Sequence, residues 1–309
     1  MLERETVAKV TGSTLISDLT VLFKVRIVVL LLLAALGGLF LGALGWPGSG
    51  PFLLIVITGA LTAMGSSAWN QYLDRDTDAL MSRTRDKRPL ANGAIRRPGW
   101  VLSVATAMIV LPVLAVAPFN LALAFFLAAG SFIYVVIYTI WLKPRTSLNI
   151  VIGGLAGSAA VLSGGAAAGA WNAPAVIALA TMLFFWTPIH FWALALVYRE
   201  DYARAKVPML PVTTTPRRSA SWGLLHGIGA TISGMAIAFL PGMGLVYAIP
   251  VGIASAVLLW QGAWLVVDPV KRRAWRLFHT SNLYLAVVLA AVIIAAVSQA
   301  QRHLSIVAR

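Results

Sequence analysis

Nine long apolar runs constrain the fold of this chain more than any other feature. Residues 53–72, for example, contain no charged side chain, and about 20 mostly apolar residues in a helix are enough to span a bilayer. The runs lie near residues 27–45, 52–72, 101–117, 120–142, 149–170, 173–198, 222–240, 246–267 and 282–299. They lack the short alternating strands of an outer-membrane barrel, so the sequence predicts an all-α, polytopic membrane protein.

The composition excludes a soluble domain. Of 309 residues, 60% are hydrophobic and only 11% are charged, whereas about a quarter of a soluble domain is charged. There is no cysteine, which excludes disulfides, thiolate metal sites and covalent c-type haem attachment. No cleavable signal is expected, because residues 1–24 mix acidic and basic side chains and the first apolar run is long enough to remain as a span. Residues 13–23 predict an interfacial helix, with a polar tail as the alternative.

The net charge of +14 follows topology and does not indicate a nucleic-acid partner. Every second connection between the runs is basic, and the connections near 46–51, 117–120, 171–174 and 241–245 contain no Lys or Arg. Because basic loops stay on the cytoplasmic side, the sequence predicts a cytoplasmic N-terminus and an outer C-terminus. The predicted parts are a cytoplasmic segment 1–24, a nine-helix domain 25–300 and a short outer tail 301–309.

The second apolar run ends in NQYLDRDTD, residues 70–78. Asn70, Asp74 and Asp78 are four residues apart, so they share one helical face at intervals of about 6 Å, while Asp76 points away from that face. Two carboxylates and an amide suit Mg²⁺, which is usually held by one or two carboxylates together with substrate phosphates. The alternative is a solvated helix end with ordinary salt bridges.

A basic segment, RTRDKRPL, follows at residues 83–90. Arg83, Arg85, Lys87 and Arg88 can bind phosphate oxygens, and Arg does so bidentately. Acidic and then basic residues at a membrane edge indicate a metal–diphosphate site. A transporter of an anionic solute is the rival from another class, but it would use broken helices at the midplane, and here the acids lie at one membrane face.

The sixth run ends in a comparable way. Tyr198 and Tyr202 lie one turn apart on one helical face, and Arg199, Asp201 and Lys206 surround them. The two charged helix ends lie on the same predicted side of the membrane, where they can face each other across one cavity.

These stretches resemble a known family. NQYLDRDTD with RTRDKRPL resembles the first aspartate-rich motif of the intramembrane, UbiA-type prenyltransferases. TPIHFWALALVYREDYARAKVPMLPV (187–212), LKPRTSLNIVIGG (142–154) and FHTSNLYLA (278–286) are similar to the protohaem IX farnesyltransferase (haem O synthase) branch. The resemblance covers residues 17–299. It implies nine transmembrane helices around a central cavity in a bacterial cytoplasmic (inner) membrane. The implied reaction transfers the farnesyl group of farnesyl diphosphate to a vinyl group of haem B, with addition of water.

The resemblance also implies roles for individual residues. The first motif of the family holds Mg²⁺ and diphosphate, and these roles carry onto Asn70, Asp74 and Asp78. A second aspartate pair of the superfamily is replaced here by Tyr198 and Tyr202. We therefore expect fewer metal ligands on the sixth helix, with Asp201 as a candidate.

Two residues depart from the family pattern. Val25 stands where proline is usual, and Lys206 stands where glycine is usual. Lys206 either adds a phosphate contact or is simply solvated.

The remaining candidates have two interpretations each. His190, after Pro188, either fills the proline kink or contacts haem, and His279 at the start of the last run is a further haem candidate. Arg145 and Asn149 open the fifth run, where they contact diphosphate or anchor the helix at the headgroups. Downstream haem-modifying or oxidase-assembly proteins are the implied protein partners. A sister prenyltransferase with a quinone or chlorin acceptor is the alternative enzyme.

Overall fold

The computed structural model describes residues 14–307, and their side chains from residue 14 to residue 298. This part of the chain contains helices and no strand, and nine of its helical segments are long and apolar enough to cross a membrane. The predicted all-α, nine-span architecture is therefore confirmed. The spans are Val25–Ala43, Ser49–Ala79, Gly99–Val116, Leu121–Leu142, Asn149–Ala167, Pro174–Val197, Pro216–Phe239, Gly244–Val267 and Lys271–Ser298.

Some spans are built from more than one helical element. The fourth changes from α-helix to π-helix at Ile133, and the fifth is interrupted at Gly154. The elements are α1 (Leu15–Leu22), α2 (Val25–Ala43), α3 (Ser49–Ala79), α4 (Gly99–Val116), α5 (Leu121–Phe132), the π-helix η1 (Ile133–Leu142), α6 (Asn149–Gly153), α7 (Leu155–Ala167), α8 (Pro174–Val197), α9 (Arg199–Arg204), α10 (Leu210–Thr213), α11 (Pro216–Ala236), the 3₁₀ helix η2 (Ile237–Phe239), α12 (Gly244–Val267) and α13 (Lys271–Val307).

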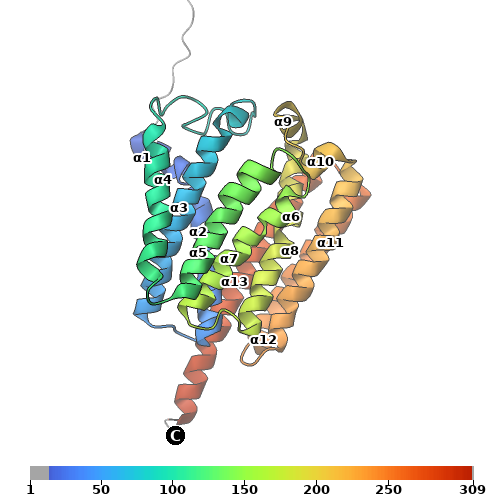
Figure 1. The fold of residues 1–309 in the computed structure, drawn as a ribbon. Coiled ribbons are helices and arrows are strands. Elements are labelled where there is room, and N and C mark those ends of the chain that lie inside the picture. Colours follow the sequence, from blue (N-terminus) through green and yellow to red (C-terminus); the bar gives the residue numbers. More distant parts are fainter. Residues whose placement is uncertain (1–13, 308–309) are drawn as a thin grey trace, which may run out of the picture.

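The spans form a closed bundle, in which each span packs against the next and α13 packs against α2 (Figure 1). Contacts between α2 and α7 and between α8 and α13 hold the bundle together across its middle. The end of α3 lies at the same end of the bundle as α9 and α10, and we call this the loop end. The C-terminal part of α13 extends from the opposite end (Figure 1). The predicted central cavity stays a prediction.

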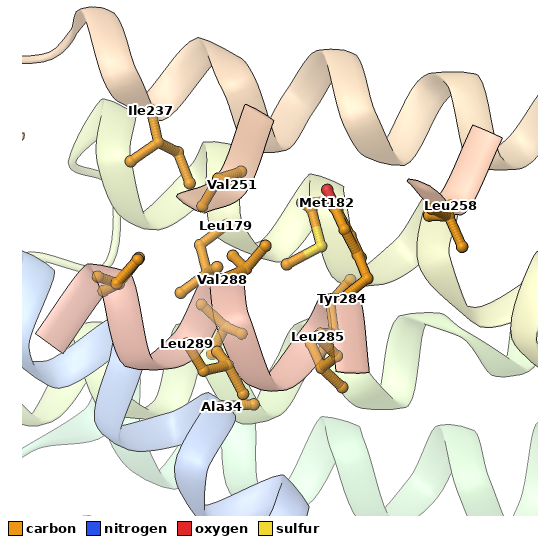
Figure 2. Packing of buried hydrophobic residues seen from close by; sticks show 14 of the residues in the cluster. Ala34, Leu179, Met182, Ile237, Val251, Leu258, Tyr284, Leu285, Val288 and Leu289 are labelled. Carbon is orange, nitrogen blue, oxygen red and sulfur yellow. The ribbon is translucent and has the colours of Figure 1, made fainter. Parts of the chain in front are cut away.

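The main apolar core lies between α8, α11, α12 and α13. Leu179 and Met182 of α8 meet Val288 and Leu289 of α13 there (Figure 2), and each of the four is at most 2% exposed. Burying such a side chain contributes about 1.5–3 kcal/mol. The core therefore fixes α8 against α13 below the loop end.

Glycines allow α2 and α7 to touch. A Cβ at Gly164 would lie 1.7 Å from the carbonyl oxygen of Ala35, and a Cβ at Gly38 would lie 2.0 Å from that of Val161. Such backbone contact is the usual role of small residues between membrane helices. The backbones of α2 and α7 can therefore approach this closely only because Gly38 and Gly164 have no side chain.

Helix α1 confirms the helix predicted near residues 13–23. Thr14 caps its N-terminus by accepting from the amide of Ser17 at 3.3 Å. Leu15 and Ile16 are exposed, whereas Leu22 at the other end is fully buried. An exposed apolar start and a buried end suit a helix lying at a membrane surface. The rest of the predicted N-terminal segment, residues 1–13, and the last two residues of the predicted tail lie outside the described part.

Candidate active site

The last two turns of α3 carry the aspartate motif on one buried face. Because α3 continues as a helix to Ala79, Asn70, Asp74 and Asp78 lie on the same face. They are 3%, 6% and 2% exposed. The side chain of Asp76 is 88% exposed. The predicted helical face is therefore confirmed, with Asp76 outside it.

Asn70 links this face to two other segments. Its Oδ1 accepts from the ammonium of Lys24 at 2.5 Å. Its Nδ2 donates to Asp74 Oδ2 at 2.8 Å and to the hydroxyl oxygen of Thr139 at 3.0 Å. These three contacts use the amide in one orientation, so the side chain is fixed. Asn70 therefore sets the position of Asp74 on the same face.

Each carboxylate of the face is paired with a cation from another segment. Lys143 Nζ lies 2.6 Å from Asp74 Oδ2, and Arg88 pairs with Asp78. Arg88 reaches Asp78 because the chain folds back after α3, where the hydroxyl of Thr84 donates to the carbonyl of Asp78 at 2.9 Å. The segment that follows α3 and the distant end of η1 therefore each supply a cation to the two carboxylates.

Lys24 and Lys143 belong to the site, although sequence reasoning used them only for topology. Both lysines begin a similar short stretch of sequence: KVR (24–26) opens the first run and KPR (143–145) opens the fifth. Shielding from water and the charge of Arg88 lower the pKa of Lys24 well below its usual value, while the two aspartates oppose this effect. The surroundings of Lys24 therefore favour an additional anion.

The π-helix η1 supplies two more groups. Tyr134 and Tyr138 stack with ring centroids 5.7 Å apart, and Tyr134 Oη accepts from Lys24 at 3.0 Å. At the end of η1 the amide of Lys143 donates to the carbonyl of Tyr138, five residues back, at 2.8 Å. π-Helices are rare and often occur at functional sites. The apolar pattern of residues 133–142 did not distinguish this π-helix from an α-helix.

The carboxylate of Asp201 is bonded to the segment after α3 and to α9. Its Oδ2 accepts from the hydroxyl of Ser82 at 2.7 Å and from the amide of Arg83 at 3.2 Å, and Arg204 pairs with its Oδ1 at 3.3 Å. Desolvation would raise the pKa of Asp201, but these hydrogen bonds outweigh it and the pKa is lowered. Asp201 therefore joins α9 to the segment after α3.

Arg83 lies between the two predicted halves of the site. Its guanidinium carbon is 5.6 Å from the ring centre of Tyr198 and 6.0 Å from that of Tyr202, and Nη2 donates to Tyr202 Oη at 3.3 Å. Burial raises the pKa of Tyr202, with Arg83 opposing, so its hydroxyl stays neutral. Nε of Arg83 is buried without a hydrogen-bond partner, as is Oδ1 of Asn149, another of the predicted site residues.

The two histidines lie in a row of rings between α8 and α13. His190 stacks on Trp186 at 4.3 Å and on Phe278 at 4.6 Å, and His279 stacks on Trp275 at 5.5 Å. His190 Nδ1 lies 2.9 Å from Ser281 Oγ on α13, a partner that the proline-kink interpretation did not include.

The other predicted contacts lie nearer the surface. Arg145 donates to the carbonyls of Ile140 and Trp141 at the end of η1, at 2.9 and 2.8 Å, so its bonds are to the fourth span and not to the fifth run that it was expected to anchor. Arg199 donates to the carbonyl of Pro211 at 2.6 Å. Lys87 and Lys206 are exposed.

The donor set of the α3 face fits Mg²⁺. Among the described residues there is no group of three or more His, Cys, Asp or Glu placed to hold a metal. A full protein cage is therefore not offered, but Mg²⁺ does not need one, since substrate phosphates complete its shell. Asp74, Asp78 and Asn70 supply two carboxylates and one amide oxygen, and cations beside them can bind the same phosphates.

Comparison with known proteins decides the family. The model of the UbiA prenyltransferase family matches residues 31–288. This chain belongs to the UbiA prenyltransferase family. Among relatives in this family, the protoheme IX farnesyltransferase of Metallosphaera sedula is 40% identical over 274 residues, 88% of this chain and 94% of the relative. The predicted family resemblance is confirmed.

Solved structures of the UbiA family share the fold. A UbiA homolog from Archaeoglobus fulgidus bound to DMAPP and Mg²⁺ matches with a TM-score of 0.63 and 18% identity, over 89% of this chain and 99% of that one. A structure from work on digeranylgeranylglyceryl phosphate synthase matches with a TM-score of 0.74 and 17% identity, over 92% of this chain and 99% of that one. At these identities the likeness shows that this chain shares the fold of those structures.

Proposed function

We propose that this membrane prenyltransferase joins the farnesyl group of farnesyl diphosphate to a vinyl group of haem B, with addition of water, and releases haem O and diphosphate. The observation that carries the proposal is the enclosed charge cluster at the end of α3, where Asp74 pairs with Lys143, Asp78 pairs with Arg88, and Lys24 contacts Asn70 on the same face. Haem B is proposed as the acceptor because this chain is 40% identical to protoheme IX farnesyltransferases over most of its length.

Asn70, Asp74 and Asp78 would hold Mg²⁺. When bound, the metal would polarise the diphosphate and neutralise its developing charge. The buried face of α3 keeps the three side chains together before substrate arrives. Each of them now contacts a cation, Lys24, Lys143 or Arg88, and these cations would turn towards the diphosphate when the metal binds. Mg²⁺ bound to a UbiA homolog together with DMAPP supports this assignment.

The surrounding cations would bind the diphosphate itself. Lys143 and Arg88 pair with the two carboxylates, and Lys24 beside them contacts Asn70 and Tyr134 instead. The cluster therefore has one more cation than carboxylates to offer an anionic leaving group. Arg83 adds a buried Nε without a partner, a donor that an anion would satisfy. An allylic diphosphate ionises more easily when the departing negative charge is stabilised in this way.

The apolar part of the substrate would lie beside the cluster, within the membrane. A buried group that includes Met81, Tyr138, Ile150 and Trp192 adjoins the polar residues of η1 and α9. Such surroundings accept a farnesyl chain and keep water from the allylic cation until the acceptor attacks. The neutral tyrosine rings offer negative faces to that cation.

Haem B would bind at the ring row of α8 and α13. The hydroxyl of Ser281 donates to the carbonyl of Phe278 at 2.8 Å. Its contact with His190 Nδ1 then has His190 as the donor, so Nε2 of His190 carries the lone pair that can bind iron. The flat rings of Trp186 and Phe278 suit stacking against a porphyrin.

One assay tests the function. Purified protein is incubated with Mg²⁺, farnesyl diphosphate and haem B, and the extracted haem is analysed by mass spectrometry. We expect a product whose mass has increased by a farnesyl group and water. Consumption of farnesyl diphosphate only with a quinone or other aromatic acceptor would replace the haem assignment by the sister reaction. No consumption with any acceptor would overturn both.

The charges of the loops are the basis for a proposed location in the cell. The nine spans would lie in a bacterial cytoplasmic membrane with the loop end facing the cytoplasm, where downstream haem-modifying or oxidase-assembly proteins would receive the product. Single tags at positions 118 and 242 should react with impermeant reagents from outside, and tags at 92 and 215 should not. The opposite pattern would place the aspartate motif on the outer side.

A further inference from the structure

Gln71, the neighbour of Asn70 in the aspartate motif, is buried and has no role in the proposed reaction. It is 1% exposed. Its Nε2 donates to the carbonyl of Val21 at 2.5 Å and to the carbonyl of Leu22 at 3.0 Å. These are the last two residues of α1, whose final carbonyls have no partner within the helix. Gln71 therefore caps the C-terminus of α1 from α3.

The residues that Gln71 holds lead directly to Lys24. The amide of Lys24 also donates to the carbonyl of Val21, at 3.1 Å. Leu22, one residue later, is fully buried against α3 and α4 in a group that includes Ala68 and Val101. The junction between α1 and α2 is therefore fixed by one side-chain amide and one buried leucine.

Lys24 has a backbone conformation that a lysine rarely adopts. Its φ is 49°, in the left-handed region that costs a residue with a Cβ about 1–2 kcal/mol. Glycine or asparagine would fit this turn at lower cost. Strain of this kind persists when the surroundings impose it, and the bonds from Gln71 are part of those surroundings. In this conformation the ammonium reaches Asn70 and Tyr134.

Adjacent residues of α3 therefore hold the same junction in two ways. Gln71 holds its backbone and Asn70 holds its side chain. We propose that Gln71 is a positioning residue, which keeps the α1–α2 junction in place so that Lys24 meets the diphosphate of the substrate. This inference rests on the proposed function in one respect, the identification of diphosphate as the anion.

A double-mutant cycle tests it with two measurements. Gln71→Met, Lys24→Met and the double variant are compared for the binding of inorganic diphosphate in the presence of Mg²⁺, and for kcat and KM with farnesyl diphosphate. Each single variant should weaken diphosphate binding by about 10-fold, the usual loss for a hydrogen bond to a charged group. In the double variant, Gln71→Met should add less than about 2-fold, because Lys24 is already gone.

Independent effects would overturn the inference, since multiplied losses would mean that Gln71 does not act through Lys24. A matched control is Asn120→Ala, which removes another amide bonded to a backbone carbonyl, that of Ala166 at 2.8 Å. It should lower thermal stability without changing diphosphate affinity. If Gln71→Met does not accumulate, Gln71→Glu enters the same cycle, because a carboxylate of equal size cannot donate to the two carbonyls.

The two proposals fail in different ways. If the two substitutions show the expected coupling in diphosphate binding but wild-type protein makes no haem O, the proposed reaction is wrong and the role of Gln71 stands. If wild-type protein makes haem O and the two substitutions act independently, the role of Gln71 is wrong and the reaction stands.

Discussion

Replacing the aspartates of α3 by asparagine tests the charge of the site without changing its size. In Asp74→Asn the amide keeps an oxygen that can accept from Lys143, whose ammonium lies 2.6 Å from Asp74. In Asp78→Asn the same holds for Arg88. Each substitution removes one negative charge from a buried face, so we expect folded protein with impaired chemistry.

The expected loss follows from the electrostatics of the site. Two unit charges about 4 Å apart interact by about 4 kcal/mol at an effective dielectric constant of about 20. Removal of one preorganised contact to a transition state typically costs about 10²–10³ in kcat. We therefore expect each variant to lose at least about 10²-fold in turnover. Chelation of divalent metal should abolish wild-type activity, and added Mg²⁺ should restore it.

Asp76→Asn is the matched control. Its side chain is 88% exposed on the same turn of α3, and surface substitutions of this kind usually change stability by less than about 0.5 kcal/mol. Turnover of farnesyl diphosphate per folded molecule is measured for all three variants, with thermal unfolding measured in parallel. Equal damage from Asp76→Asn would refute the helical-face reasoning. Full activity after chelation would refute the metal, and the cations alone would then bind the diphosphate.

Further predictions concern packing, backbone and haem. Gly164→Ala should destabilise the protein by more than about 3 kcal/mol, beyond ordinary overpacking, because the new methyl meets a backbone carbonyl; Gly50→Ala, which has open space, should not. Lys206→Gly should raise stability by about 1 kcal/mol, since φ is 54° there, and turnover will fall only if Lys206 contacts phosphate. At least one of His190→Ala and His279→Ala should weaken haem retention in absorption spectra; unchanged spectra and turnover in both would make these residues structural.

The parts of the structure that sequence predicts are those set by local periodicity. The nine spans follow from the length of the apolar runs, and the shared face of Asn70, Asp74 and Asp78 follows from the 3.6-residue turn of a helix that continues to Ala79. The same reasoning assigned Asp76 correctly to the outside. In each case the relevant information lies within a few turns of one helix.

Contacts between distant segments were not predictable in this way. Asp201 was a candidate for the metal, because Tyr198 and Tyr202 stand where the resemblance implies an aspartate pair. In the structure it binds Ser82 and the amide of Arg83, which lie more than a hundred positions earlier. Spacing along one helix carries no information on which loop folds back onto it. At position 206, in contrast, the glycine that the resemblance implies would suit the positive φ that Lys206 adopts.

The two lysines that sequence reasoning missed both depend on unusual backbone. Lys24 reaches Asn70 from a left-handed conformation, and Lys143 reaches Asp74 from the end of a π-helix, whose wider turn changes the direction of every side chain after Ile133. Neither conformation follows from the propensity of the residues concerned. Local preferences are usually violated where function requires a particular geometry. The places where sequence-based prediction failed are therefore themselves an indication that the end of α3 is the active site.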